Sequence, residues 1–562
     1  MKRVYVYWAA VLFLGLLWGC YKDEGNYDYK DLPQIEMETV LLWNDDTEEY
    51  DTETHLLHYK IGEEIHIRPN LTFVNGKEDM RLKYTWKLNN ERVVGTEEVL
   101  RWKTDTTGSF YLVLDVEDEE NGTRFMGSYH ATIEALYQGW GFLVLSEKEG
   151  KKMVSFIDKG TYLNNPSSDY PFEAQIDLYT AVNGFSVPGN TCKLLEYYRK
   201  ATAGRQSQLL ALAPNSFVDF DAYSFEYLGN SDSYLQEALT DMHNIVMMQY
   251  VDLIETEKGK LYQRRKTTNG VFQYGKFLKA PMEYTNRDGE MEVMEDIRLI
   301  PGNCGASRNF ILAFDNSNKR YLAISDSKDI FLDNTSAGRV CEIAYQTGTW
   351  PEGVTPLNDM EGCEVLYTGS RNQNEWSSLN YVSVMKRNGT WYYQEFNIQG
   401  ESNSDYGYSV MVPSGSIKQT ELPAKLAAVI DGNSLFCVVD DGGFSYNSTH
   451  PWLYVAVGND LYLCNLQDET LTNGSIFGPL TFDSKITALN GKCYSGGYLA
   501  VGLENGEFYI IRNDEAKNHW TWDEKDPSDS YYGLVHYHLP AGQLGKIIDI
   551  QYKNDGYSAG WN

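Results

Sequence analysis

The sequence predicts an all-β protein, in which an N-terminal immunoglobulin-like β-sandwich is followed by a seven-bladed β-propeller. Tyrosine and glycine are abundant, at 42 and 48 of 562 residues, and they suit strands and turns. Hydrophobic residues make up 42% of the chain, which is enough to fill sizeable cores and excludes global disorder. Short apolar strands recur in hairpin pairs through the C-terminal three quarters of the chain, as in a propeller.

The first residues form a targeting segment. Lys2 and Arg3 precede an apolar stretch from Val4 to Leu17, which is too short to span a bilayer comfortably. The stretch ends in Leu17-Trp18-Gly19-Cys20, which resembles the lipobox of bacterial lipoproteins, although Trp18 is bulkier than usual. The resemblance implies a signal peptide over residues 1–19, cleavage before Cys20 and lipidation of that cysteine. An ordinary secretory signal and a short anchor helix are the alternatives.

Residues 20–30 are expected to form a tether. Lys22-Asp23-Glu24 follows the cysteine closely and resembles the surface-export signal of Bacteroidota lipoproteins; a plain solvated segment is the alternative. Loss of Lys2 and Arg3 with the signal peptide changes the formal net charge from −31 to −33. So acidic a chain repels a phosphate backbone, and we therefore expect no nucleic-acid partner.

Residues 31–136 have the alternation of a small β-sandwich. Apolar and polar residues alternate through Leu82–Leu88, Phe110–Val116 and Ala131–Ala135, which places one face of each strand in a core. We assign Trp86 to that core and not to a ligand. Tyr84-Thr85-Trp86-Lys87-Leu88 and Tyr111 to Asp118 resemble the two signature strands of a PKD-like domain. Together with Gly25-Asn26-Tyr27-Asp28-Tyr29, they resemble PKD-like family lipoproteins of Bacteroidota over roughly residues 17–160.

Residues 137–562 carry the propeller pattern. Apolar hairpin pairs begin near residues 143, 209, 245, 310, 381, 452 and 498, and we expect one blade for each. Asn388-Gly389 and Asn505-Gly506 predict tight hairpin turns. Gly545 to Ile550 could supply the strand that closes the ring, and Ser233 to Met242 has the spacing of a short helix. Two packed β-sandwiches are the rival architecture.

No catalytic motif is present, and we expect no enzyme activity. The chain lacks HExxH, the GxSxG elbow, a Walker A loop and GxGxxG after a strand. His536 and His538 stand two apart and could hold a metal from one side of a strand, although unrelated edge histidines are the more ordinary interpretation. Calcium is a possible cofactor where six carboxylates crowd together, although a solvated loop is the alternative: Asp45, Asp46, Glu48, Glu49, Asp51 and Glu53.

Aromatic residues near the C-terminus are the candidate ligand-binding residues. Trp520 and Trp522 precede a polar loop, and Tyr531 and Tyr532 follow it. Exposed aromatic rings bind sugar rings or peptide side chains by apolar contact. Packing between blades is the alternative role for the same four residues.

The family resemblance implies an accessory role in nutrient uptake. Such lipoproteins look like partners of a TonB-dependent outer-membrane transporter and its SusD-like lipoprotein, that is, of a SusC/SusD-like system. We therefore expect a lipid-anchored, outer-membrane protein that faces the cell exterior and captures peptide or glycan fragments. A surface hydrolase with its site in the propeller funnel, and a purely structural scaffold, are the alternatives.

Overall fold

The computed structural model divides the chain into two compact units, Met1–Glu134 and Ala135–Asn562. It describes residues 34–553, except 39–42, 45–48, 51–56, 75–79, 160–171, 202–203, 248–249, 266–274, 286–288, 301–309, 327–336, 371–378, 404–406, 441–450, 469, 493–496 and 514–533. The division falls two residues before the domain boundary expected from the sequence. None of the helices in these ranges is long and apolar enough to cross a membrane.

The first unit is a β-sandwich. Its main sheet has five strands in the order β4-β11-β10-β7-β8, with β4 parallel to β11. These are β4 (Leu57–Lys60), β7 (Leu82–Leu88), β8 (Arg92–Gly95), β10 (Gly108–Asp118) and β11 (Arg124–Glu134). The remaining strands form two-stranded ladders: β1 (Gln34–Glu38) with β6 (Asn70–Val74), β5 (Glu64–Ile67) with β9 (Leu100–Lys103), and β2 (Trp43–Asn44) with β3 (Glu49–Tyr50).

The sandwich core confirms the position expected for Trp86. Its side chain is fully buried and packs with Tyr129, and its indole nitrogen donates a 3.0 Å hydrogen bond to the carbonyl of Glu97. Leu112 and Leu114 of β10 face the same core, as the period-2 alternation of this strand requires.

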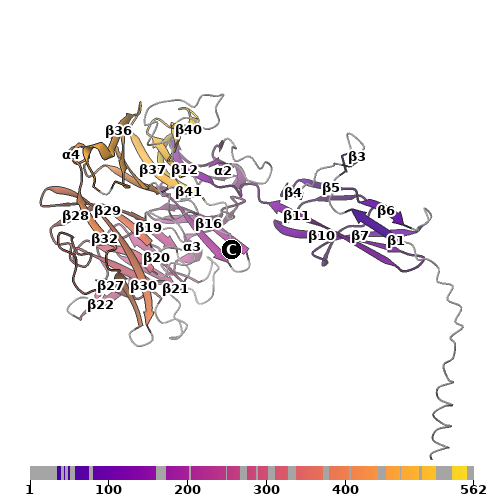
Figure 1. The fold of residues 1–562 in the computed structure, drawn as a ribbon, viewed down its shortest axis with the longest axis horizontal. Helices are drawn as coiled ribbons and strands as arrows, with labels where there is room; N and C mark the ends of the chain where they lie inside the picture. The colour runs from indigo at the N-terminus through magenta and orange to yellow at the C-terminus, as the bar shows by residue number, and fades with distance from the viewer. Residues whose placement is uncertain are drawn as a thin grey trace, which may run out of the picture. The chain divides into compact units, whose positions relative to one another are not determined.

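The second unit is a seven-bladed β-propeller, labelled from β12 to β41 in Figure 1. Blade 1 contains β12 (Gly141–Lys148), β13 (Lys151–Asp158), β14 (Glu173–Gln175) and β41 (Lys546–Lys553). After α2 (Leu178–Asn183), blade 2 contains β15 (Lys193–Ala201), β16 (Gly204–Ala213), β17 (Ser216–Asp221) and β18 (Tyr227–Asn230). Blade 3 contains β19 (Met242–Met247), β20 (Val251–Thr256) and β21 (Leu261–Arg265), followed by the hairpin β22 (Glu283–Thr285) and β23 (Met291–Val293).

Blades 4 and 5 share one nine-stranded sheet. Blade 4 contains β24 (Ile297–Leu299), β25 (Phe310–Asp315), β26 (Arg320–Ser325) and β27 (Val340–Tyr345). Blade 5 contains β28 (Cys363–Ser370), β29 (Leu379–Arg387), β30 (Thr390–Asn403), β31 (Gly407–Val412) and β32 (Ile417–Glu421). The long strand β30 pairs with β29 and β32 along its first part and with β31 along its last part, and β31 then pairs in parallel with β27. Backbone hydrogen bonds therefore join these two blades.

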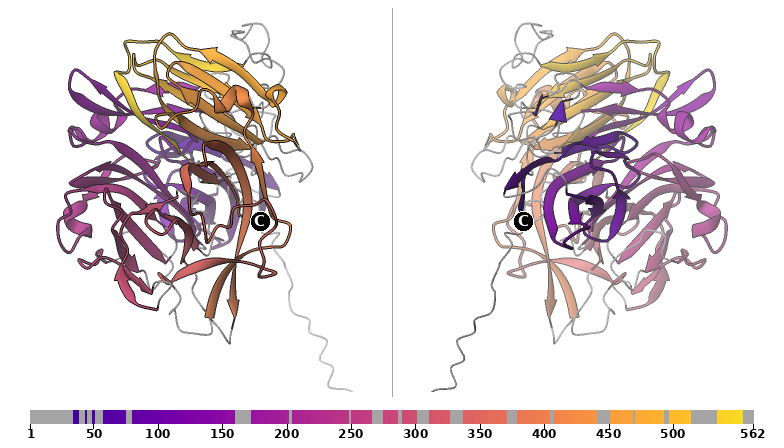
Figure 2. Two further views of the ribbon diagram at one scale, coloured as in Figure 1. Left: turned by 90° about the vertical axis from the view of Figure 1, so that its left-hand side faces the viewer. Right: turned by 90° about the vertical axis from the view of Figure 1, so that its right-hand side faces the viewer.

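Blades 6 and 7 complete the ring. After α4 (Ala424–Ala427), blade 6 contains β33 (Leu435–Asp440), β34 (Pro451–Val457), β35 (Asp460–Asn465) and β36 (Ile476–Thr481), with the 3-10 turn η2 (Asn473–Ser475). Blade 7 contains β37 (Ile486–Lys492), β38 (Tyr498–Leu503), β39 (Phe508–Arg512) and β40 (Val535–Leu539). The last strand, β41, returns to pair with β12, so the strand expected at the C-terminal end closes the ring. Figure 2 shows these yellow strands beside the purple first blade.

Hydrophobic clusters between neighbouring blades hold the propeller together. In the described part of the unit, one cluster lies between each pair of successive blades, and the cluster between blades 7 and 1 completes the circle. On β12, Leu143 and Leu145 pack toward blade 2, whereas Phe142 and Val144 pack toward blade 7. A strand held between two blades is therefore apolar on both faces, which is why these strands read as continuous apolar runs.

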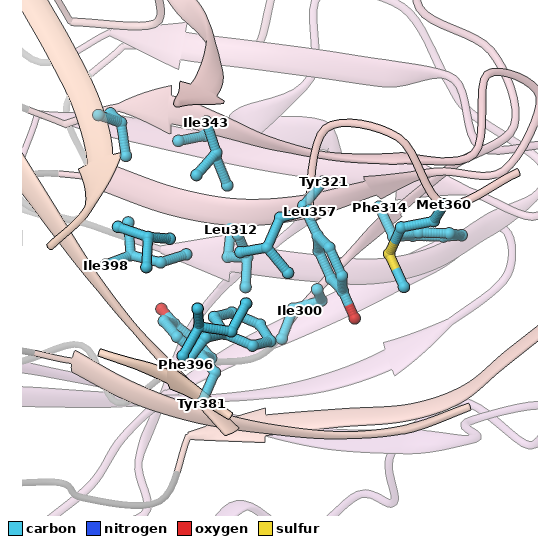
Figure 3. Packing of buried hydrophobic residues seen from close by; sticks show 14 of the residues in the cluster. Ile300, Leu312, Phe314, Tyr321, Ile343, Leu357, Met360, Tyr381, Phe396 and Ile398 are labelled. Atoms are coloured by element: carbon cyan, nitrogen blue, oxygen red, sulfur yellow. The ribbon is translucent and has the colours of Figure 1, made fainter. Parts of the chain in front are cut away.

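The contact between blades 4 and 5 illustrates this packing (Figure 3). Phe396 of β30 stacks on Tyr381 of β29, with ring centroids 5.7 Å apart, and contacts Tyr321 of β26 at 5.5 Å. Ile343 and Ile398 extend the same cluster. Aromatic rings thus carry the packing from one blade to the next.

Each of the seven expected hairpin starts falls in a different blade, which confirms the blade number. Six of them begin the second strand of a blade, and only residue 245 lies in an innermost strand. The innermost strands of blades 2, 4, 5 and 7 were not expected, whereas β41 was expected over Gly545 to Ile550. Strand β15, for example, contains Glu196, Arg199 and Lys200 and so lacks a continuous apolar run. The helix expected over 233–242 was wrong: α3 (Ser231–Tyr234) is a single turn, and Leu235 already pairs with Phe277 in a bridge.

Candidate functional site

The two faces of the propeller differ in their connections. Tight turns join the second and third strands of each blade on one face, for example Asn388-Gly389, where both residues have positive φ. We call this the hairpin face. The first and second strands, and the third and fourth, are joined on the opposite face, which we call the connection face. Strand β39 ends at Arg512 and β40 begins at Val535, both on the connection face. The aromatic segment expected from the sequence lies between these two residues in the chain.

Six rings meet on the connection face where blades 1 and 7 come together. We call this group the seam cluster: Trp140, Phe172, Tyr498, His536, Tyr537 and Tyr552. Trp140 contacts Phe172 at 5.5 Å and Tyr498 at 5.4 Å between ring centroids. Phe172 in turn meets the rings of His536 at 5.5 Å and Tyr537 at 5.8 Å. Edge and tilted contacts of this kind are the favoured geometry for aromatic pairs.

The seam cluster combines buried and accessible rings. Phe172 and Tyr552 are each only 5% exposed and belong to the core between blades 7 and 1. Trp140, Tyr498, His536 and Tyr537 are half-buried. Buried rings anchor the group, and the half-buried rings present apolar surface to solvent. Such a surface can stack on a sugar ring or on an apolar side chain.

One positive charge lies within this aromatic group. The ammonium of Lys159 is 4.8 Å from the centroid of the Phe172 ring and 3.2 Å from Nε2 of His536. Lys159 is only 6% exposed, and its backbone N–H donates to the carbonyl of Trp140. The site therefore offers both apolar faces and polar hydrogen-bonding groups.

Sequence reasoning missed the seam cluster. Apart from the adjacent His536 and Tyr537, its members are far apart in the chain between positions 140 and 552, so no local motif marks the cluster. The available signal was that Trp140 and Tyr498 each stand at the start of an apolar strand. Ring closure between β12 and β41 then brings them together.

The other sequence-based candidates lie largely outside the described residues. These are Cys20, the export residues Lys22, Asp23 and Glu24, the aromatic residues Trp520, Trp522, Tyr531 and Tyr532, and the side chains of the carboxylates between 45 and 53. His536 and His538 are described, and they do not share a face. His536 contacts Phe172 toward blade 1, whereas His538 stacks on Tyr509, which packs toward blade 6. A β-bulge in the β39–β40 pairing separates the two rings, which contradicts the shared metal site.

A second polar group surrounds the propeller axis near the hairpin face. Lys193 of β15 donates a 3.0 Å hydrogen bond to Asn244 of β19, and the backbone N–H of Leu194 donates a 2.7 Å bond to Asp549 of β41. Arg298 of β24 binds Glu255 of β20 at 2.9 Å. These bonds join blades 1 and 2, 2 and 3, and 3 and 4. They form polar ties between the inner parts of neighbouring blades.

The pKa values of the titratable residues near the propeller axis do not favour an activated nucleophile. Burial raises the pKa of Asp549 to about 6. Burial and the negative charge of Asp549 raise the pKa of the Cys192 thiol, which is the reverse of what an attacking thiolate needs. Desolvation lowers the pKa of His243, so this imidazole is uncharged at neutral pH. Within the described ranges, no three His, Cys, Asp or Glu side chains gather as metal ligands would.

Comparison with known proteins identifies the N-terminal region. Residues 20–190 match the model of the PKD-like family, and the match covers the sandwich and strands β12, β13 and β14 of the first blade. No curated protein matches the sequence.

Solved structures are only distantly similar. A quinonprotein alcohol dehydrogenase-like protein from Bacteroides thetaiotaomicron aligns over 92% of this chain and 99% of its own, at 13% identity and a TM-score of 0.35. Apo AztD from Citrobacter koseri aligns over 84% and 97%, at 9% identity and 0.33. The dihydro-heme d1 dehydrogenase NirN aligns over 85% and 76%, at 12% identity and 0.29. At these scores the likenesses bear on neither the fold nor the activity of this chain.

Proposed function

We propose that this protein is a non-catalytic, lipid-anchored binding component of a TonB-dependent uptake system at the bacterial outer-membrane surface. The observation that carries the proposal is the seam cluster, in which half-buried aromatic rings are held on a rigid ring-closed scaffold. Aromatic surface with a few fixed polar groups is the usual chemistry for holding a sugar ring or a peptide side chain. The cargo would therefore be a peptide or glycan fragment.

Rigidity supports this use of the site. Phe172 and Tyr552 are buried in the core between blades 7 and 1, and the half-buried rings pack against them, so the ring positions are set before a ligand arrives. Preorganised rings lose little conformational entropy on binding, and more of the contact energy then appears as affinity. Support for anchoring comes from the sequence, where Cys20 follows a lipobox-like segment.

The test is affinity purification of the tagged, lipidated protein from detergent-solubilised outer membrane, with mass spectrometry of the co-eluting material. We expect a TonB-dependent transporter and a SusD-like lipoprotein in near-stoichiometric amounts, together with bound peptides or glycans. A protein that elutes alone would contradict the accessory role, and screening for peptide or glycan cleavage would follow.

Variants of the seam cluster test the binding surface itself. Tyr498→Ala is expected to lower the amount of co-eluting ligand about tenfold, the effect of losing roughly 1.4 kcal/mol of contact. It should leave transporter recovery unchanged. Phe185→Ala is the matched control, because Phe185 is a 47% exposed aromatic residue between blades 1 and 2, away from the seam cluster. Equal ligand loss in both variants would contradict a site at the seam.

A further inference from the structure

Lys159 and His536 belong to the two blades that meet where the ring closes. Lys159 directly follows β13 of blade 1, and His536 lies in β40 of blade 7. Their side-chain nitrogens are 3.2 Å apart, which is a hydrogen-bonding distance. The Lys159 ammonium also lies over the face of the Phe172 ring, where the ring quadrupole stabilises a positive charge.

Elementary acid–base chemistry assigns the protons in this pair. A lysine ammonium ordinarily loses its proton near pH 10.4 and an imidazolium near pH 6.5, so at neutral pH lysine is the charged partner. An ammonium has only donors. Nε2 of His536 must therefore accept, which leaves the imidazole uncharged with its proton on Nδ1.

We propose that Lys159 is the positioning residue of the seam cluster. Its ammonium holds His536 as the neutral imidazole with the proton on Nδ1, and this hydrogen bond fixes the His536 ring against Phe172 and Tyr498. The role assigned to the ring rests on the proposed binding function, but the contact itself does not. His536 then presents an Nδ1–H donor, and its ring keeps edge contact with Phe172 at 5.5 Å and a tilted contact with Tyr498 at 5.5 Å.

Acidification should break this arrangement. A protonated His536 cannot accept from Lys159, and two positive charges would then stand 3.2 Å apart. Among the described residues that pack here, the other titratable groups are the hydroxyls of Tyr498 and Tyr537, whose ordinary pKa lies near 10, and the carboxyl of Glu173. The carboxylate of Glu173 acts on Tyr537, whose pKa is raised mainly by burial. A negative charge on Glu173 would oppose the effect of Lys159, which itself lies at hydrogen-bonding distance from His536.

Nuclear magnetic resonance of the mature protein with isotope-labelled histidine tests the proposal without a ligand. His536→Gln assigns the signal. We expect the wild-type His536 signal to titrate at least about one pH unit below 6.5, because a unit charge at hydrogen-bonding distance strongly disfavours a second one. Lys159→Met keeps the side-chain length without charge and should raise that midpoint by at least one unit. Lys159→Arg should restore the low midpoint.

An unchanged midpoint in Lys159→Met, with the other histidines titrating as in the wild type, would overturn the proposal. Should Lys159→Met fail to fold, the nitrogen shifts of the wild-type protein alone decide the matter. A proton on Nδ1 is the expected result, and a proton on Nε2 would overturn it. The spectra can contradict the role of Lys159 while the purification still recovers bound ligand, and the purification can recover no ligand while the spectra support the role of Lys159. The two experiments therefore test this proposal and the proposed binding function separately.

Discussion

Charged residues inside this propeller form hydrogen bonds or ion pairs with neighbouring strands. Asp549 lies on the closing strand and accepts a hydrogen bond from the backbone of blade 2, with Lys193 nearby. Burial nevertheless dominates and raises its pKa from 3.8 to about 6. The folded protein therefore binds this proton more tightly than the unfolded chain does.

Replacement of Asp549 should change how stability depends on pH. A raised carboxyl pKa means that stability falls as pH rises through the interval from about 4 to 6, and that the loss is complete above it. Asp549→Asn removes this loss and keeps an acceptor for Leu194. We expect the variant to be about 3 kcal/mol more stable than the wild type at pH 7.5 and equal to it well below pH 4, as measured by urea unfolding. A pH-independent difference would contradict this account.

A buried ion pair in blade 3 gives a second prediction at this scale. Arg264 is 1% exposed, sits over the Phe277 ring, and binds Asp252, its cross-strand partner, at 2.5 Å. Asp252→Ala should cost about 3–5 kcal/mol, because it leaves the guanidinium buried without this carboxylate.

The double variant Asp252→Leu with Arg264→Met is the control, since it removes both charges and should recover most of the lost stability. Thermal unfolding followed by circular dichroism measures both. A double variant as unstable as the single one would show that packing, and not the loss of the carboxylate beside Arg264, sets the cost.

Among the elements, the closing strand β41 stabilises the propeller through contacts with two blades. It supplies the inner strand of blade 1 and buries Ile547, Ile550 and Tyr552 against blade 7. Each such apolar side chain contributes about 1.5–3 kcal/mol when it is buried. Without β41, the ladder edge of β12 and the core between blades 7 and 1 would both be open to water.

Truncation of the chain therefore tests ring closure. A protein ending at residue 545 should lose cooperative thermal unfolding and become sensitive to limited proteolysis, because β12 loses its partner. A protein ending at Lys553, the last residue paired with β12, should unfold like the full-length chain. Equal protease resistance of the two truncations would contradict a closing role for β41.

The molecule as a whole joins an acidic PKD-like N-terminal region to a propeller. If Cys20 carries the lipid, the acyl chains hold both units at the membrane, since each buried CH₂ contributes about 0.8 kcal/mol. Cys20→Ala should then move the protein from the membrane fraction to the soluble fraction in immunoblots. Persistence in the membrane fraction after carbonate washing would contradict lipid anchoring.

Much of the fold could be read from the sequence, but the binding surface could not. The strand containing Trp86 was expected with the bounds that the structure shows, because period-2 alternation is a local property. The inner strands of blades 2, 4, 5 and 7 were not expected, and a helix over 233–242 was expected where Ser231–Tyr234 forms a single turn. The surroundings of these segments, and not their own patterns, decide their structure. The spacing of His536 and His538 left a shared metal site open as the less ordinary interpretation, and a bulge turns the two side chains to different faces.

The sequence by itself determined the all-β class and the sandwich core, and its seven hairpin pairs predicted seven blades. These features follow from period-2 alternation and from strands that are apolar on both faces. Both patterns are local, because the residues of a strand reflect which of its faces are buried. Only the tertiary structure decided that Trp140, Phe172, Tyr498 and His536 meet. Their contacts depend on the C-terminal strand pairing with the first blade, and a contact across almost four hundred residues leaves no periodic trace in the chain.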